Sequence, residues 1–238
     1  MRPIVIAICL ATVAFAEDPA PKKSDAAAEE LLKKVEAKIQ KAKTVSIRCA
    51  AEVTMGKAPM KFDMALDFKE GNRAKMLLTT IAADGKQESG GAACDGKTMR
   101  TKKKTGVTEA PAAADFAEKA RAMSVRVSLI ELSMAFEGTF SKDPLVCSEY
   151  AFLPDEKVGD RTARVVAFVA TRGALRLDMK LWIDEKQLAV MKREWVGKKG
   201  DRESRETVTY SKMTCDEEIP DEVFATNEVK EEGKKDGK

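Results

Sequence analysis

The sequence predicts an α+β protein in which helices cover a single curved antiparallel sheet. Apolar residues recur at every second position in most of residues 45–81 and again in 161–213, which is typical of strands with one apolar face. A helical period of apolar residues occurs in residues 25–43 and 111–136. One twisted sheet with the helices over its opening would bury all of these apolar faces together.

Composition limits the functions open to the chain. Its 238 residues fit one domain with a sizeable core. The net charge is only +3, of which Arg2 supplies one charge, and this small excess argues against a nucleic-acid-binding protein. The chain has no His, which removes the commonest general base, the commonest metal ligand and every Ser-His or Cys-His catalytic arrangement. We therefore expect a binding or structural protein, not an enzyme, with no cofactor and no metal.

The first residues have the pattern of a secretory signal peptide. Arg2 is followed by the apolar run Ile4–Val13, and Ala14-Phe15-Ala16 provides an A-x-A cleavage site before acidic residues. The run is shorter than the roughly 20 residues of a membrane-spanning helix. Cys9 follows Ile8, which is not the small residue that a lipid-attachment site needs. Cleavage of residues 1–16 would release a soluble periplasmic or secreted protein.

The expected domain, residues 25–225, follows a polar linker of residues 17–24 and opens with a helix. Asp25 is a suitable N-cap, and the acidic pair at 29–30 lies in the first turns, where the helix dipole favours it. The helix should end near Lys43. Its apolar residues fall on one face, opposite lysines: Leu31, Leu32, Val35 and Ile39.

An antiparallel meander is expected from residue 45 to about residue 104. Asp84-Gly85 and Asp95-Gly96 are typical of tight hairpin turns. Alternation of apolar and polar residues marks strands at 45–55, 60–68 and 73–81. Each of these strands therefore has one apolar and one mostly polar face.

A helical stretch is expected next, opened by Pro111 and continuing as one long helix or two shorter helices to Phe136. Its apolar face consists of Phe116, Ala120, Met123, Val127, Ile130 and Met134. Strands resume after Pro144, with candidates at 161–170, 175–184, 188–196 and 205–213. The tail, residues 226–238, is charged and lacks a core, so we expect it to be disordered.

Four cysteines remain after the predicted cleavage: Cys49, Cys94, Cys147 and Cys215. An even number in an oxidising compartment suggests two disulfide bonds, and the sequence leaves all three pairings open. The alternative is free buried thiols that pack as small apolar side chains. Their spacing is too wide for a zinc site or a Cys-x-x-Cys redox motif.

The segment Gly91–Thr98 fits the nucleotide-binding pattern G-x-x-x-x-G-K-[ST]. That loop needs a buried strand before it and a helix directly after it, whose N-terminus faces the phosphates. Here the polar residues 87–90 precede the pattern, and the strand-like residues 99–104 follow it. We therefore expect a hairpin turn and no bound nucleotide.

Several segments taken together resemble a known family. They are the helix Leu31–Ile39 leading into the strand at Val45, residues 62–68 with Gly71-Asn72-Arg73, the Asp95–Thr98 hairpin, Leu177–Asp184 with its Leu-Trp-Ile-Asp ending, and Tyr210-Ser211 followed by Ile219–Phe224. Over residues 28–225 this arrangement is similar to the outer-membrane lipoprotein-sorting carriers of the LolA/LolB-like superfamily. The resemblance implies an unclosed antiparallel half-barrel, with an N-terminal helix and a mid-chain helical lid over an apolar cavity.

The resemblance also implies a site for an acyl chain and brings no catalytic residues with it. The concave face would be lined by Phe62, Met64, Leu66, Phe68, Met76, Leu78, Leu177, Met179 and Leu181. The lid would contribute Phe116, Met123, Val127 and Ile130. The expected partners are a lipid or an acylated lipoprotein, and an envelope protein that loads or receives it; we expect a monomer.

A second interpretation stays open. The same alternation describes an ordinary packed core, which would make the protein a non-catalytic structural, interaction or stress-sensing domain of the cell envelope. Loops such as Lys102–Lys104 would then carry the binding.

The many methionines on the apolar faces favour the first interpretation, because flexible and polarizable side chains suit a surface that accepts varied apolar ligands.

Overall fold

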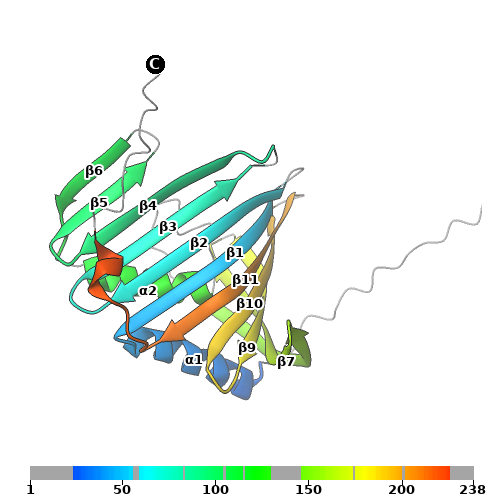
Figure 1. The fold of residues 1–238 in the computed structure, drawn as a ribbon. Coiled ribbons are helices and arrows are strands. Elements are labelled where there is room, and N and C mark those ends of the chain that lie inside the picture. The colour runs from blue at the N-terminus through cyan, green and yellow to red at the C-terminus, as the bar shows by residue number, and fades with distance from the viewer. Residues whose placement is uncertain are drawn as a thin grey trace, which may run out of the picture.

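Figure 1 shows the computed structural model, which describes residues 24–55, 59–82, 84–103, 106–114, 116–129, 146–173, 175–199 and 202–225. The predicted signal peptide, nearly all of the linker and the charged tail lie outside these ranges. The elements in chain order are α1 (Ala26–Lys41), β1 (Thr44–Met55), β2 (Pro59–Lys69), β3 (Arg73–Ile81), β4 (Gln87–Asp95), β5 (Thr98–Lys103), β6 (Gly106–Pro111), α2 (Phe116–Leu129), β7 (Val146–Val158), β8 (Arg161–Arg172), β9 (Leu175–Asp184), β10 (Ala189–Lys199), β11 (Arg202–Cys215) and the short 3-10 helix η1 (Asp221–Phe224).

The 11 strands form one antiparallel sheet in the order β6-β5-β4-β3-β2-β1-β11-β10-β9-β8-β7. Neighbours in the sheet are also neighbours in the chain except at its centre, where β1 pairs with β11. This pairing joins the meander that precedes α2 to the meander that follows it. The sheet curves around the two helices without closing, so β6 and β7 are its edges (Figure 1). The predicted α+β class and the unclosed sheet are confirmed.

Helix α1 forms where the sequence predicts it. The Asp25 carboxylate accepts hydrogen bonds from the backbone N–H groups of Ala27 (2.8 Å) and Ala28 (3.4 Å), which caps the helix. The backbone N–H of Asp25 donates to the carbonyl of Tyr150 (2.7 Å), which fixes the start of α1 against β7. The helix ends at Lys41, slightly before the predicted end. Its buried residues are Ala28, Leu31, Leu32, Val35 and Ile39.

The mid-chain helix begins later than the sequence predicts. Pro111 does not open a helix but ends strand β6, opposite Thr98 of β5. Proline has no N–H to donate, and an edge strand tolerates it because one side of that strand has no partner. Helix α2 begins only at Phe116. The rest of the predicted helical run, including the lid residue Ile130, lies outside the described residues.

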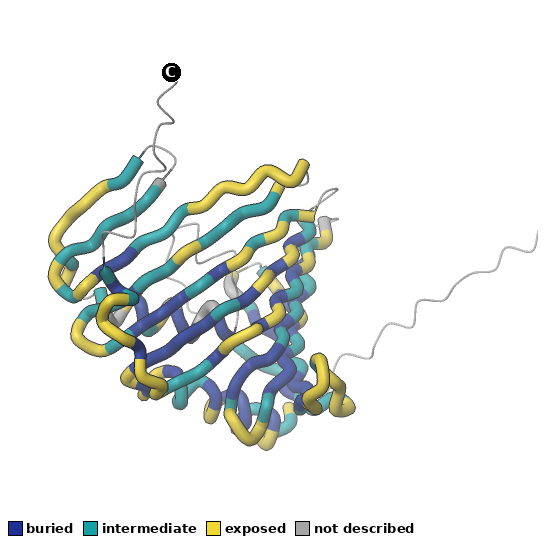
Figure 2. Tube along the Cα trace, viewed as in Figure 1, coloured by how far each residue is buried: buried dark blue, intermediate teal, exposed yellow. Residues whose placement is uncertain are grey.

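The inner face of the sheet and both helices share one hydrophobic core. It includes the alternate β1 residues Val45, Ile47, Cys49 and Ala51, together with α1 and α2 residues. Figure 2 shows that burial decreases along β2, β3 and β4 towards their upper ends in that view. A second, smaller cluster lies on the outer face and consists of Ala163, Val165, Trp182 and Met191. No helix within the described ranges is long and apolar enough to span a membrane.

The prediction of two disulfide bonds is wrong, because Cys49, Cys94, Cys147 and Cys215 are all free. They lie on β1, β4, β7 and β11, and most of these strands are separated by two or more others. Strands are about 4.8 Å apart, so such cysteines exceed the roughly 7 Å that a disulfide spans between Cα atoms. Strands β1 and β11 are neighbours, but Cys215 pairs with Val45 and Cys49 pairs with Tyr210. The alternative of free thiols therefore holds.

Candidate functional site

A group of half-buried apolar side chains lies where α2 crosses the inner face of β2 and β3. The register pairs Met64 with Leu78 and Leu66 with Met76, so these side chains share one face of the sheet. Along β2, Phe68 and Leu66 are buried, whereas Phe62 near the other end is only half-buried. Apolar side chains therefore become more accessible towards one end of this face.

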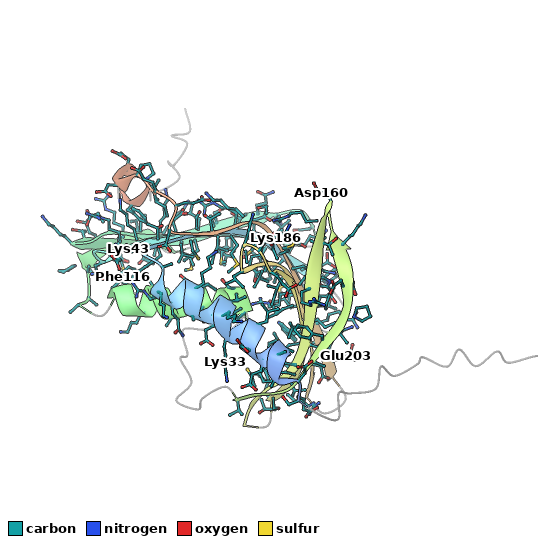
Figure 3. All side chains as sticks on the ribbon, turned by 90° about the horizontal axis from the view of Figure 1, so that it is seen from below. Lys33, Lys43, Phe116, Asp160, Lys186 and Glu203 are labelled. Atoms are coloured by element: carbon teal, nitrogen blue, oxygen red, sulfur yellow. The ribbon has the colours of Figure 1, made fainter. Side chains whose placement is uncertain are left out.

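Helix α2 is tethered by polar contacts at both ends. Near its start, the Arg121 guanidinium lies 5.2 Å from the centre of the Phe68 ring and donates to the carbonyl of Gln40 at the end of α1 (3.1 Å). Near its end, the carbonyl of Ser128 accepts a hydrogen bond from the Tyr210 hydroxyl of β11 (3.2 Å). Figure 3 shows α1 and α2 side by side over the inner face, with Phe116 at the start of α2. Both helices thus cover the concave side of the sheet.

The predicted cavity residues divide into two groups. The first is wholly buried in the core: Met64, Leu66, Phe68, Leu177, Met179 and Leu181. The second packs against that core and is half-buried: Phe62, Met76, Leu78 and Phe116. Met123 and Val127 lie on α2, but their side chains, like the whole of Ile130, are outside what the structure describes. The half-buried group therefore forms the candidate site.

A buried ion pair on the inner face was not predicted from the sequence. Arg193 of β10 and Glu206 of β11 form a salt bridge, and both side chains are 0% exposed. Burial by itself lowers the pKa of Arg193, but neighbouring Tyr210 and Glu206 outweigh it, so the pKa is raised and the guanidinium stays charged. The signal was present in the alternation Glu206-Val208-Tyr210, which places a carboxylate on an apolar face.

Cys49 and Tyr210 lie near this ion pair, and their pKa values are those of groups buried away from water. Burial raises the pKa of the Cys49 thiol to about 12, with Arg193 opposing this effect and Glu206 adding to it. Burial likewise raises the pKa of the Tyr210 hydroxyl. Both groups therefore remain neutral near pH 7.

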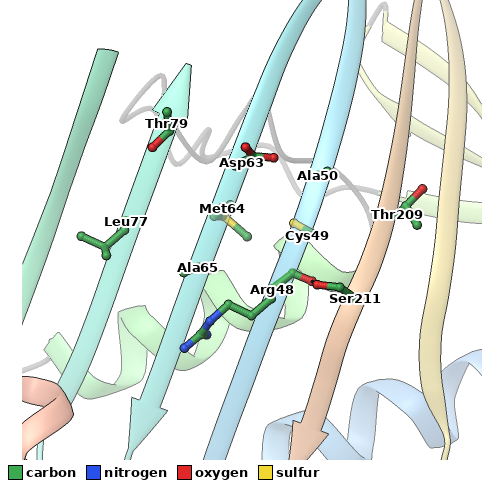
Figure 4. A pocket seen from close by; sticks show the side chains of 10 residues that line it. All are labelled: Arg48, Cys49, Ala50, Asp63, Met64, Ala65, Leu77, Thr79, Thr209 and Ser211. Carbon is green, nitrogen blue, oxygen red and sulfur yellow. The ribbon is translucent and has the colours of Figure 1, made fainter. Parts of the chain in front are cut away.

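A shallow depression of about 490 Å³ lies on the opposite, outer face of the sheet (Figure 4). Its lining includes Leu77, a large apolar side chain that is 43% exposed. At one side Arg48 pairs with Asp67, with 2.7 Å between Nη2 and Oδ2. Small side chains such as Ala50 and Ala65 form much of the floor. This feature was not predicted from the sequence, because alternation describes the outer face of these strands only as mostly polar.

The segment Gly91–Thr98 is a β-hairpin, as predicted. The Asp95 carboxylate accepts hydrogen bonds from the backbone N–H groups of Lys97 and Thr98, both at 2.9 Å. Strand β5 follows directly at Thr98. The turn thus lacks the helix that would direct its N-terminus towards a phosphate group. Within the described ranges, no group of three or more His, Cys, Asp or Glu side chains is arranged to hold a metal ion.

No protein-family model and no curated protein matches the sequence. Solved structures do match, among them LprF from Mycobacterium bovis, with 12% identity over 83% of this chain and 97% of that chain and a TM-score of 0.49. MucB matches with 14% identity over 84% of this chain, which corresponds to 63% of MucB, and a TM-score of 0.46. The LolA superfamily protein NE2245 from Nitrosomonas europaea matches with 10% identity over 84% of this chain and 98% of that chain, and a TM-score of 0.35. At these identities the likeness is one of fold alone.

Proposed function

We propose that this protein binds a lipid acyl chain between α2 and the inner face of β2 and β3. The observation that carries the proposal is the half-buried group Phe62, Met76, Leu78 and Phe116, which borders a fully packed core. Apolar contact contributes about 25 cal/mol for each Å² removed from water, so such a surface favours a long hydrocarbon chain. Methionine adapts its shape to different chains, which favours broad specificity.

The rest of the proposal follows from the sequence. The leader pattern of residues 1–16 supports export to the periplasm or outside the cell. The ligand would be a free lipid or the acyl group of a lipoprotein, taken up and released without covalent chemistry. An envelope protein that supplies or receives the ligand would be the physiological partner.

Two neighbouring leucines provide a matched test. Leu78 faces inwards in the candidate site, whereas Leu77 faces outwards into the depression on the other side. Wild type, Leu78→Glu and Leu77→Glu would be titrated with 1-palmitoyl-lysophosphatidylcholine, with N-phenyl-1-naphthylamine as a displaceable fluorescent probe. Leu78→Glu should weaken binding by about tenfold or more, because a charge would be placed against the chain. Leu77→Glu should bind like wild type, and circular dichroism would check that both variants are folded.

A second candidate function is a protein-interaction domain with a filled core. It is favoured by the complete burial of Met64 and Met179 and by the exposed Leu77 in the outer depression. In that case neither the lipid nor the probe would bind to wild type, and the acyl-chain proposal would be rejected. Equal lipid binding by wild type and folded Leu78→Glu would reject the proposed site.

A further inference from the structure

Trp195 of β10 carries an unpaired polar group inside the core. Its side chain is only 5% exposed, and its indole Nε1 has no hydrogen-bond partner among the described residues. A buried N–H normally has an acceptor, because an unpaired one loses the hydrogen bond that water supplies in the unfolded chain. The protein's other tryptophan obeys this rule, since Trp182 Nε1 donates to the Glu156 carboxylate at 2.9 Å.

The Trp195 ring packs beside Gly197. A Cβ placed on Gly197 would lie 3.2 Å from Cζ3 and 3.6 Å from Cε3 of Trp195, so this edge of the ring packs on the glycine. Nε1 belongs to the opposite edge of the indole and therefore faces away from Gly197. Such a Cβ would also lie 2.8 Å from Cδ2 of Leu177, so glycine leaves room at this position for both the leucine and the ring.

A row of paired residues connects Trp195 to the candidate site. Trp195 pairs with Glu206, Glu206 pairs with Val53, and Val53 pairs with the half-buried Met60, next to the Phe62 position on the same face of β2. Three strand spacings separate Met60 from Trp195, or about 14 Å. A long acyl chain has the length to cover this distance, and it would take the place of the atoms that pack over Val53 and Glu206, which are 1% and 0% exposed.

The charges near Trp195 favour a neutral acceptor. Arg193 and Glu206 already compensate each other within the core. An additional full negative charge would face the Glu206 carboxylate in a medium of low dielectric constant, where repulsion is strong. A carbonyl oxygen accepts a hydrogen bond without adding charge.

We propose that Trp195 Nε1 donates a hydrogen bond to the ester or amide carbonyl oxygen of a bound acyl chain, whose tail runs across the inner face towards Phe62 and Leu78. This inference rests on the proposed function and adds a polar subsite to it. The ligand class is therefore a carbonyl-linked acyl chain, as distinct from an alkyl chain joined by an ether bond.

Two lysophospholipids that differ only in the carbonyl test this subsite. Wild type and Trp195→Phe would be titrated with 1-palmitoyl-lysophosphatidylcholine and with its ether analogue, 1-O-hexadecyl-lysophosphatidylcholine, by displacement of N-phenyl-1-naphthylamine. Wild type should prefer the ester by about tenfold, the effect of one hydrogen bond in a buried site. Trp195→Phe should lose this preference and bind the two lipids with equal affinity.

A second measurement leaves Trp195 in place, in case Trp195→Phe does not fold. In ¹⁵N-tryptophan-labelled protein, the ester lipid should shift the indole N–H resonance of Trp195 downfield more than the ether lipid does, and the Trp182→Phe variant assigns the two signals. Equal affinities for the two lipids and equal shifts would overturn the subsite and leave the proposed function standing. Failure of both lipids to bind wild type would overturn the function, and the subsite with it.

Discussion

The two halves of the inner face share one sequence pattern but differ in how fully they are covered. Met179 of β9 is 1% exposed and Val208 of β11 is 0% exposed, whereas Met76 and Leu78 of β3 are only half-buried. All four occupy inward positions of a period-two alternation. Alternation therefore identifies the face of a strand, while the depth of burial depends on what packs over that face.

The more buried half is also the half that contains polar groups. Arg193, Glu206 and Trp195 all lie on β10 and β11, within the core. The less buried half of β2 and β3 has apolar residues at the corresponding inward positions: Phe62, Met64, Met76 and Leu78. In the proposal made above, the less buried half around β2 and β3 (the open half) holds the hydrocarbon, and the more buried half around β10 and β11 (the closed half) recognises the polar group at one end of the chain.

Removing one member of the buried ion pair should have the largest effect. Arg193→Met removes the guanidinium that compensates the buried Glu206 carboxylate, and the free energy of unfolding should fall by about 3–5 kcal/mol. The double variant Arg193→Met/Glu206→Leu should recover most of this loss, because two apolar side chains replace both charges. Urea unfolding of the four proteins of this cycle would measure the coupling.

An exposed pair supplies the control for this cycle. Arg176 and Glu149 form a surface contact with 3.4 Å between Nη1 and Oε1, and Arg176→Met should change stability by about 0–1 kcal/mol. If Arg193→Met changed the free energy of unfolding as little as Arg176→Met does, water would reach Glu206. The closed half would then be no drier than the open half.

Truncation of matched methionines should give the next largest effect. Met179→Ala should reduce stability by about 2–5 kcal/mol, because a cavity would form in a packed region. Met76→Ala should reduce stability by clearly less, because part of that side chain already contacts solvent. Denaturant midpoints compare the two, and equal losses would show that both halves of the inner face are packed alike.

Much of the fold follows from local sequence patterns, and the exceptions have physical causes. Alternation located seven of the 11 strands, β1 to β3 and β8 to β11, and Asp25 located the start of α1. Pro111 was misassigned because proline suits both the first turn of a helix and the end of an edge strand. The expected disulfides depended on which strands are neighbours, and local patterns do not encode the β1–β11 pairing that sets the sheet order.

The sequence predicts which face of the strands the candidate site occupies, and that these residues bind a ligand stays a prediction. Nine of the thirteen expected positions lie on strands, and the register places these on the inner face. Whether Leu66 or Leu78 is accessible was not predictable, because that depends on where α2 crosses the sheet. Trp195 was not considered for the site, since its unpaired Nε1 is a property of the packed structure.

The smallest expected effect concerns Cys49, which lies on β1 between the two halves. Its folded-state pKa is about 12, whereas the thiol of an unfolded chain titrates near 8.5. Above about pH 8.5 the unfolded chain therefore binds fewer protons than the native protein, and stability falls as pH rises towards 12. From pH 8.5 to 9.5 wild type should lose about 1 kcal/mol more than Cys49→Ala, as measured by urea unfolding. The two proteins are compared by how their stability changes with pH, so any loss of stability from Cys49→Ala that is the same at both pH values cancels. Parallel curves for the two proteins would mean that the thiol ionises in the folded state, and hence that water reaches the boundary between the closed and the open half.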